Sequence, residues 1–250
     1  MTPVPAPSSP LVESDIPLYA QGLNAPQREA VLTTEGPVLM LAGAGTGKTA
    51  ALTARLAHLV ATRRAWPSEI LCVTFTNKAA REMRERVAKL LPGDSGEGLT
   101  VCTFHALGLK FLQLEHARAG LRRGFSVFDG DDALAIIKDL APTGLKPDAL
   151  MTLRELVSKA KNAALDPDQA AAVAASPKER EAAAIYRAYQ QRLKAFNAVD
   201  FDDLIRLPLQ LLEADPEFAA GWRERIRYLL VDECQDTNGA QYRLLRQLAG

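Results

Sequence analysis

Short apolar runs along the chain predict strands that are buried on both faces. None of these runs alternates between apolar and polar positions, which is typical of strands in a parallel sheet covered on both sides. They are Val38–Leu41, Ile70–Phe75, Leu99–Phe104 and Tyr228–Val231. Apolar residues at helical spacing follow in Thr49–Val60, Lys78–Leu91 and Gln241–Leu248. This order of strands and helices predicts an α/β fold with right-handed crossovers.

The stretch between the third and fourth predicted strands is too long for one crossover and shows no strand pattern. Its alanine-rich segments predict helices, and prolines interrupt the pattern at Pro142, Pro147, Pro167 and Pro177. We therefore expect an α/β domain that is interrupted by a mostly helical insertion. The predicted boundaries are a disordered tail over 1–20, the α/β domain over 21–104 and 199–250, and the insertion over 105–198. Gly250 suits the C-cap of the last helix.

The composition is that of a globular protein and excludes few functions. Of the 250 residues 48% are hydrophobic, and 30 basic side chains balance 30 acidic ones. This zero balance neither supports nor excludes a nucleic-acid partner, because affinity for phosphates depends on a local basic patch. No run is long enough to span a membrane and the N-terminus lacks the pattern of a signal peptide, so we expect a cytoplasmic protein. Cys72, Cys102 and Cys234 are expected to be buried, reduced thiols.

A glycine-rich segment between the first predicted strand and the first predicted helix is expected to bind the phosphates of a nucleotide. Glycines let successive backbone N–H groups point at an anion, and the start of the helix adds its positive dipole. Lys48 can neutralise the β- and γ-phosphates, and the Thr49 hydroxyl can bind Mg²⁺. A turn that binds nothing is the alternative, and the flanking strand and helix argue against it. The segment is Ala42, Gly43, Ala44, Gly45, Thr46, Gly47, Lys48 and Thr49, with Ala42 in place of the usual glycine.

An acidic pair, Asp232 and Glu233, follows the fourth predicted strand. Ligands of open parallel sheets bind at the carboxyl ends of the strands, so this pair is expected to share one Mg·ATP with the glycine-rich segment. Asp232 can hold the metal, and Glu233 can orient and deprotonate the attacking water. With Lys48, these are the predicted catalytic residues. A solvated turn is the alternative for an acidic pair that stands alone.

The motifs in this order resemble those of the UvrD/Rep-type superfamily 1 DNA helicases. The resemblance runs from about Leu23 to Gly250. Besides the glycine-rich segment, it rests on Leu23–Gln27, Val73–Ala80, Thr103–Ala106, Val199–Leu204 and Val231–Asn238. Two positions depart from the family pattern, since Cys234 replaces a frequent aromatic residue and Ala50 a frequent arginine.

The resemblance implies a RecA-like P-loop NTPase domain with a helical insertion. Such a motor uses ATP and Mg²⁺ to move 3′ to 5′ on single-stranded DNA and to unwind duplexes from single-strand/duplex junctions. Gln27 would bind the adenine edge, since its amide offers both a donor and an acceptor. The second RecA-like domain, with its γ-phosphate arginines, has no counterpart in these residues. We therefore expect little ATP turnover from this chain alone.

The resemblance also assigns DNA contacts to the ends of the second and third predicted strands. Aromatic rings there can stack on unpaired bases, and polar side chains can bond to phosphates. The segments are Phe75, Thr76, Asn77 and Lys78, and Thr103, Phe104 and His105. Taken singly, the two phenylalanines fit a core position better, and the resemblance reverses that preference.

Some alternatives stay open at this point. Another P-loop protein, such as a nucleotide kinase or a transport ATPase, is disfavoured by Gln27 and by the segment from Val73 to Ala80, and a helicase–nuclease subunit is not excluded. The lysines of Ser158–Asn162 can contact a DNA backbone or lie on an ordinary solvated helix face. His58 and His116 are expected to be ordinary surface or core residues, and Trp66 and Trp222 are expected to pack against other residues.

Overall fold

The computed structural model describes residues 17–41, 43 and 45–249. These residues divide into two compact units, one of residues up to Ile70 with Arg81–Thr100, and one of Leu71–Ala80 with Val101 onward. The α/β prediction is confirmed, since strands and helices succeed each other along the chain. No helix in the described part of the chain is long and apolar enough to cross a membrane.

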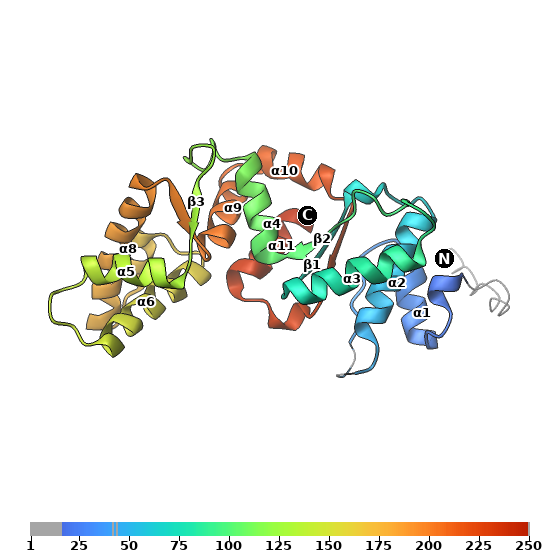
Figure 1. The fold of residues 1–250 in the computed structure, drawn as a ribbon, viewed down its shortest axis with the longest axis horizontal. Helices are drawn as coiled ribbons and strands as arrows, with labels where there is room; N and C mark the ends of the chain where they lie inside the picture. Colours follow the sequence, from blue (N-terminus) through green and yellow to red (C-terminus); the bar gives the residue numbers. More distant parts are fainter. Residues whose placement is uncertain (1–16, 42, 44, 250) are drawn as a thin grey trace, which may run out of the picture. The chain divides into compact units, whose positions relative to one another are not determined.

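The first unit packs two helices against each other (Figure 1). A capping box between Asn24 and Gln27 opens the first of them, and Gly47, at a φ of 86°, precedes the second. Val31 meets Ala51 and Ala54 in the core between them, where small alanine side chains allow the helices to approach closely. The elements are η2 (Leu18–Ala20), α1 (Ala25–Leu32), α2 (Lys48–Ala61), η3 (Pro67–Glu69) and most of α3 (Asn77–Leu90).

Three predictions for this unit are wrong. Val38–Leu41 form no strand, and Leu39 and Leu41 are 75% and 85% exposed, because an apolar run becomes a strand only where a neighbour offers backbone partners. Trp66 is 74% exposed and therefore does not pack in the core. Leu18–Ala20 form a short helix with Ala20 buried, although the tail prediction covered them. The rest of the predicted tail, residues 1–16, lies outside the described residues, as does Gly250.

The second unit contains a three-stranded sheet in the order β2-β1-β5, covered by helices (Figure 1). Leu71 and Val73 of β1 lie in a core that also contains residues of helices α4, α9, α10 and α11. The backbones of α4 and α9 approach so closely that a side chain at Gly108 would clash with the carbonyl of Leu204. The elements are β1 (Ile70–Thr74), β2 (Thr100–Thr103), β5 (Tyr228–Val231), α4 (Phe104–Leu114), α9 (Asp203–Ala214), α10 (Pro216–Arg225) and α11 (Gly239–Ala249). Strands β1, β2 and β5 and helix α11 confirm the strands and the last helix that the sequence predicted.

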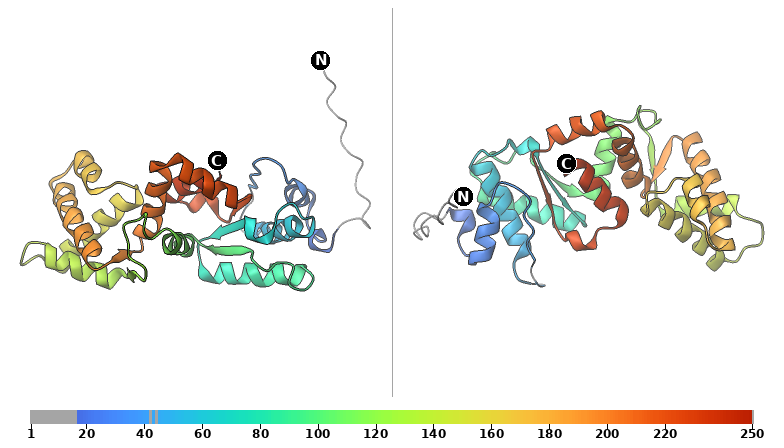
Figure 2. Two further views of the ribbon diagram at one scale, coloured as in Figure 1. Left: turned by 90° about the horizontal axis from the view of Figure 1, so that it is seen from above. Right: turned by 180° about the vertical axis from the view of Figure 1, so that it is seen from behind.

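A second group of helices in this unit has a core of its own, apart from the three-stranded sheet in both views of Figure 2. Pro147, Pro167 and Pro177 each occupy the first turn of a helix, where the missing N–H costs nothing. The prolines therefore separate helices, as predicted. This group comprises α5 (Gly130–Leu140), α6 (Pro147–Asn162), α7 (Pro167–Val173) and α8 (Pro177–Ala195).

The predicted insertion differs from this helical group at both ends. His105, placed at the start of the insertion, belongs to α4, which packs in the core of the three-stranded sheet. Two short strands were missed, β3 (Ser126–Phe128) and β4 (Ala198–Asp200), which pair in parallel. Three residues are too few to show a period of two, so their pattern could not be distinguished from a helix end.

The three cysteines and Trp222 differ in how deeply they are buried. None of the three cysteines forms a disulfide in the described structure, but only Cys72 is buried, while Cys234 is exposed. Cys234 lies in the turn after β5, outside any core. Trp222 is buried among the helices of the sheet core, as predicted.

We predict that His58 makes the stability of the first unit depend on pH. Its Nδ1 is 2.8 Å from the Tyr19 hydroxyl, and burial, with Arg55 and Arg64, lowers its pKa. Because the unfolded ring has the higher pKa, about 6.5, the stabilisation is complete above that pH and is lost as the pH falls below it. His58→Gln should flatten this dependence and cost about 1 kcal/mol at pH 8.

Urea unfolding at a series of pH values, followed by circular dichroism, measures this effect. His116→Gln is the matched control, because it removes a half-exposed ring from the second unit. The free energy of unfolding of His58→Gln should change less between about pH 5 and pH 8 than that of the wild type. An equally steep pH dependence in His58→Gln would contradict the assignment.

Candidate functional site

The glycine-rich loop of the first unit leads directly into α2, as predicted. Thr46 closes the loop by donating from its hydroxyl to the carbonyl of Gly43, at 2.7 Å. Gly45 and Gly47 have φ angles of 74° and 86°, which side chains rarely adopt, so glycine is required at both positions. Lys48 is the first residue of α2, and Ala51 is bonded through its amide to the carbonyl of Gly47. The amides near the start of α2 therefore precede the helical hydrogen bonding and suit an anion.

Gln27 lies against this loop. Its Nε2 donates to the carbonyl of Thr46 at 2.6 Å, and a side chain at Gly47 would come within 2.9 Å of that nitrogen. Its Oε1 accepts from the backbone of Asn24 at 3.0 Å, within the capping box of α1. One N–H and one lone pair of the amide are left, which is what an adenine edge needs. The structure thus brings together Gln27 and the loop that sequence reasoning assigned to one nucleotide.

The remaining loop residues are half-buried or exposed. Lys48 and Thr49 are half-buried at the start of α2, and Gly43 is exposed. Ala42 and Ala44, which belong to the predicted loop, lie outside the described residues. The role of each loop residue in nucleotide binding stays a prediction.

The acidic pair of the second unit stands at the end of β5. The backbone N–H of Asp232 donates to the carbonyl of Val73 at 2.9 Å, and its carboxylate lies 3.4 Å from the hydroxyl of Thr74. Asp232 is therefore held beside the end of β1 and is 92% buried, since only 8% of it is exposed. Burial, the charge of Asp232 and nearby Cys102 all raise the pKa of Cys72, so this thiol stays protonated.

Glu233 directs its carboxylate differently from Asp232. It is a non-glycine residue in the left-handed region, with φ at 49°, and it begins the 3-10 turn η4 (Cys234–Asp236). Gln235 donates to its Oε2 at 2.6 Å. Left-handed backbone costs about 1 kcal/mol for a residue with a side chain. Such strain at a half-buried carboxylate is typical of a functional position.

The predicted DNA contacts divide into exposed and buried residues. Thr76, Asn77 and Lys78 are exposed at the start of α3, next to β1. Thr103 is buried and caps α4 by accepting from the amide of Ala106 at 3.2 Å. Phe104 is only 1% exposed in the core, so its assignment to base stacking is wrong.

Phe75 and His105 remain as candidates beside the buried ring of Phe104. Phe75 is half-buried, and its ring centroid lies 5.4 Å from that of Phe104. The His105 ring lies 5.5 Å from the ring of Phe201, edge to face. Burial lowers the pKa of His105, and the charge of Asp202 partly opposes this, so the ring is neutral at pH 7 and can accept or donate one hydrogen bond.

No group of three or more metal-ligating side chains occurs among the residues that the structure describes. A Mg²⁺ that binds nucleotide needs few protein ligands, because phosphates and waters fill most of its octahedral shell. A hydroxyl and one carboxylate are the usual protein contribution to that shell, and the assignment of Thr49 and Asp232 to it stays a prediction.

Comparison with known proteins decides which family this architecture belongs to. The sequence profile of the UvrD/REP helicase N-terminal domain matches residues 23–250. The chain belongs to the UvrD/REP helicase family. The resemblance that the motifs carry is thereby confirmed.

The relatives are all longer than this chain. It is 46% identical over 231 residues to the ATP-dependent DNA helicase Rep of Escherichia coli (strain K12), which covers 91% of this chain and 34% of that protein. It is 41% identical over 234 residues to the ATP-dependent DNA helicase PcrA of Bacillus subtilis (strain 168), with 91% and 31% covered. It is 42% identical over 256 residues to the ATP-dependent DNA helicase UvrD1 of Mycobacterium tuberculosis (strain ATCC 25618 / H37Rv), with 99% and 32% covered. The chain thus spans about a third of the length of these relatives.

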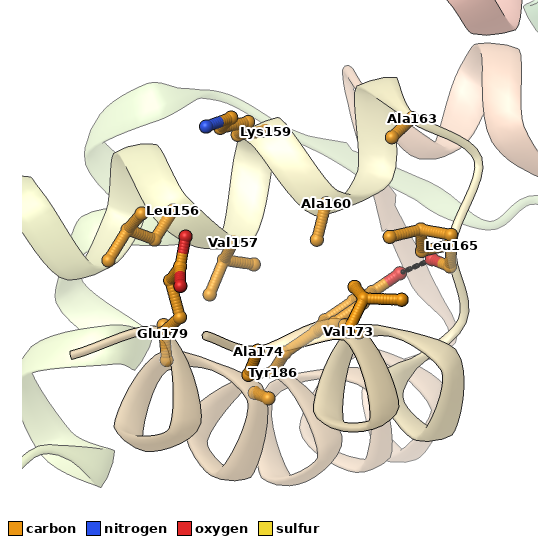
Figure 3. Close-up of a pocket in the computed structure, with 13 residues that line it drawn as sticks. Leu156, Val157, Lys159, Ala160, Ala163, Leu165, Val173, Ala174, Glu179 and Tyr186 are labelled. Carbon is orange, nitrogen blue, oxygen red and sulfur yellow. Dashed lines mark hydrogen bonds between the residues drawn. The ribbon is translucent and has the colours of Figure 1, made fainter. Parts of the chain in front are cut away.

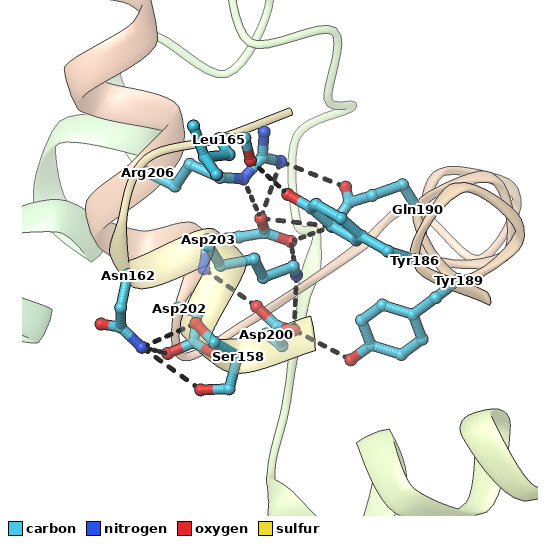
Figure 4. Close-up of polar contacts among 11 residues, drawn as sticks. Ser158, Asn162, Leu165, Tyr186, Tyr189, Gln190, Asp200, Asp202, Asp203 and Arg206 are labelled. Atoms are coloured by element: carbon cyan, nitrogen blue, oxygen red, sulfur yellow. Dashed lines mark hydrogen bonds and ion pairs between the residues drawn. The ribbon is translucent and has the colours of Figure 1, made fainter. Parts of the chain in front are cut away.

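The largest departure from expectation in this UvrD/REP chain is a buried ionic cluster (Figure 4). The ammonium of Lys161 lies 2.6 Å from a carboxylate oxygen of Asp200 and 3.0 Å from one of Asp203. Arg206 pairs with the other oxygen of Asp203 at 2.8 Å, and the hydroxyl of Tyr189 donates to Asp200 at 2.9 Å. Lys161 therefore contacts neither DNA nor solvent, which corrects both alternatives left open for it; Lys159 alone is exposed.

The charges in this cluster are fixed by their neighbours. Burial favours a raised pKa at Asp203, but Lys161 and Arg206 outweigh it and hold that pKa below its ordinary value. Burial and the charge of Asp203 raise the pKa of Asp200, against the effect of Lys161. One signal in the sequence could have revealed the cluster. Lys161 follows Leu153 and Val157 at intervals of four residues, so it occupies the buried stripe of α6, where a cation needs an acidic partner.

An apolar cavity of about 130 Å³ lies between α6, α7 and α8 of this UvrD/REP chain (Figure 3). Alanine, valine and leucine side chains line most of it, and the hydroxyl of Tyr186 is already bonded to the carbonyl of Leu165 at 2.9 Å. Glu179, at its edge, is engaged in the capping box of α8. Lys159 is the one cation among the lining residues, and the rest of the lining is too apolar for a triphosphate, so the cavity is not a candidate nucleotide site.

We predict that Lys161→Met destabilises the second unit by about 3–5 kcal/mol, because it leaves two buried carboxylates without their shared cation. Lys159→Met on the same helix is the matched control and should change stability by less than about 0.5 kcal/mol. Guanidinium unfolding of the two variants measures the difference. Equal stabilities would mean that the cluster does not hold these helices to the segment that contains Asp200 and Asp203.

Proposed function

We propose that this chain is the nucleotide- and DNA-binding part of an ATP-dependent DNA helicase that moves 3′ to 5′ on single-stranded DNA. The observation that carries the proposal is the hydrogen bond from Gln27 to Thr46. It holds the Gln27 amide, with one N–H and one lone pair left for adenine, against the loop that leads into α2. The relatives are ATP-dependent DNA helicases by name, which supports the same activity. The substrate would be single-stranded DNA and its junctions with duplex.

Each predicted site residue has a proposed role. Backbone amides of the loop from Ala42 to Thr49 bind the phosphates, and Lys48 neutralises the charge that develops on the β- and γ-phosphates. Thr49 and Asp232 contribute to the Mg²⁺ shell, and Gln27 binds adenine. Glu233 orients and deprotonates the attacking water.

The DNA strand is proposed to lie along the ends of β1 and β2. Thr76, Asn77 and Lys78 are exposed there and can bond to phosphates, and Phe75 offers part of its ring to a base. His105 is half-buried at the start of α4. Thr103 caps α4, which begins at this edge.

The domain organisation that we propose follows the two cores of the second unit. Helices α5 to α8 form the helical insertion, and the strands with the loop of the first unit form the RecA-like domain. The partner that such a domain needs for rapid hydrolysis is a second RecA-like domain with its arginines, since an arginine finger contributes about 10³–10⁵ in rate. The curated relatives are about three times as long as this chain, which leaves room for that domain.

The second candidate function is a module that binds ATP and single-stranded DNA with little turnover of its own. Lys48, Glu233 and the exposed residues after β1 support binding, and no described residue is assigned as the arginine finger. A nucleotide kinase or a transport ATPase, the other P-loop possibility, would ignore single-stranded DNA, so the same binding assay separates it from both.

Lys48→Ala should abolish nucleotide binding, because it removes the cation that faces the β- and γ-phosphates. Single-stranded DNA binding should be unchanged. Anisotropy of a fluorescent ATP analogue with Mg²⁺, and of a fluorescent oligothymidylate, measures both on one preparation. The control is Lys89→Ala, an exposed lysine of α3. A chain that binds the nucleotide equally well without Lys48, or that ignores DNA, contradicts the proposal.

Glu233→Gln should keep ATP binding and slow hydrolysis by about 10²–10⁴, the range that a general base contributes. The rate is measured in single-turnover hydrolysis by the complete gene product with DNA present. Glu224→Gln, an exposed carboxylate of α10, is the control. Loss of ATP binding in Glu233→Gln, with slow hydrolysis only as a consequence, would assign Glu233 to binding instead of proton transfer.

A further inference from the structure

Three side chains form a chain of hydrogen bonds between the turn after β5 and the segment before α9. The Asn238 amide donates to Oδ1 of Asn162 at 2.7 Å. Asn162 in turn donates from Nδ2 to Oδ1 of Asp202 at 3.0 Å, and to the backbone and hydroxyl oxygens of Ser158 (Figure 4). We call Asn238, Asn162 and Asp202 the amide relay.

Asn238 lies at the end of the turn that begins with Asp232 and Glu233 after β5, which we call the acidic turn. Asn238 and Gln241 exchange side-chain to backbone hydrogen bonds at 2.9 and 3.0 Å, which caps α11. Between Glu233 and Asn238 the chain is closed by η4, in which Thr237 bonds to the carbonyl of Cys234 at 2.8 Å. Glu233 and Asn238 are therefore joined by a short, internally bonded turn.

The Asp202 end belongs to the edge of the predicted DNA contacts. Its charge acts on His105, whose ring also lies against Phe201, the residue before Asp202. Ser158 and Asp202 both line a cavity of about 190 Å³. A DNA phosphate that binds His105 would therefore change the electrostatic field at Asp202.

A side-chain amide such as that of Asn162 fits the middle of the relay. It must accept from Asn238 and donate to Asp202 at the same time, and a terminal amide has both functions on one rigid plane. A carboxylate there would face Asp202 with like charge, and an apolar side chain would leave Asn238 and Asp202 without these partners. Asn162 is also the last residue of α6, so the relay ties the helical group to both ends.

We propose that Asn162 is a positioning residue that couples single-stranded DNA at the His105 edge to nucleotide at the acidic turn. The inference rests on the proposed function, since it requires that both ligands bind. It adds a residue that touches neither ligand. Coupling is a free energy between the two binding equilibria, and it is reciprocal, so it can be measured from either side.

The test measures the affinity of the 250-residue chain for a fluorescent, non-hydrolysable Mg·ATP analogue with and without saturating oligothymidylate. The ratio of the two affinities is the coupling. In the wild type we expect a ratio of about 5 or more, the lower end for allosteric proteins. Asn162→Ala should bring the ratio close to 1, while each ligand alone binds as in the wild type. A purely structural role would lower stability and leave the ratio unchanged.

Two further variants make the assignment specific. Asp202→Ala should lower the ratio as Asn162→Ala does, and the double variant should lower it no further, because residues of one relay are not additive. Gln191→Ala, which removes an exposed amide from α8, is the matched control and should keep the wild-type ratio.

The remaining outcomes separate this inference from the proposed function. A wild type that binds both ligands with a ratio of 1 overturns the relay and leaves the proposed function standing. A wild type with coupling that Asn162→Ala retains also overturns the relay. A wild type that binds neither ligand overturns both proposals.

Discussion

The pairing of β5 with β1 is the constraint on which the second unit depends. The hydrogen bond from the amide of Asp232 to Val73 continues the sheet to the point where the acidic residues begin. It holds a buried carboxylate beside Thr74, directly before the exposed segment that we assign to DNA. Because one ladder fixes the ends of both strands, Asp232 is held close to the residues after β1 that are proposed to bind DNA.

The buried ionic cluster attaches the helical group to the rest of the second unit. Lys161 joins α6 to Asp200 and Asp203, so the helical group is attached to the strand core through charges that cannot reach water. Buried pairs add little net stability compared with apolar side chains of the same size, but removing one partner is costly. The cluster therefore specifies how α6 meets α9, and it holds Asn162 where it can reach Asn238.

The sequence predicted the local features well and the non-local ones poorly. Strands β1, β2 and β5, helix α2 and the glycine positions follow from patterns of a few residues. Val38–Leu41 failed because strand formation depends on a distant partner, and Phe104 failed because burial is decided by helices far along the chain. Lys161 was misassigned since its partners lie about forty residues away, although the spacing of the buried residues of α6 pointed to it.

The central claim is that Asp232 serves the metal of a bound nucleotide. The direct measurement is the Mg²⁺ dependence of ATP-analogue affinity in Asp232→Asn, which keeps the backbone bond to Val73, with Asp236→Asn in the exposed turn as control. We expect Mg²⁺ to tighten binding about tenfold, or 1.4 kcal/mol, in the wild type and the control. In Asp232→Asn the affinity without Mg²⁺ should persist and the tightening should disappear. Equal tightening by Mg²⁺ in all three proteins would contradict the account.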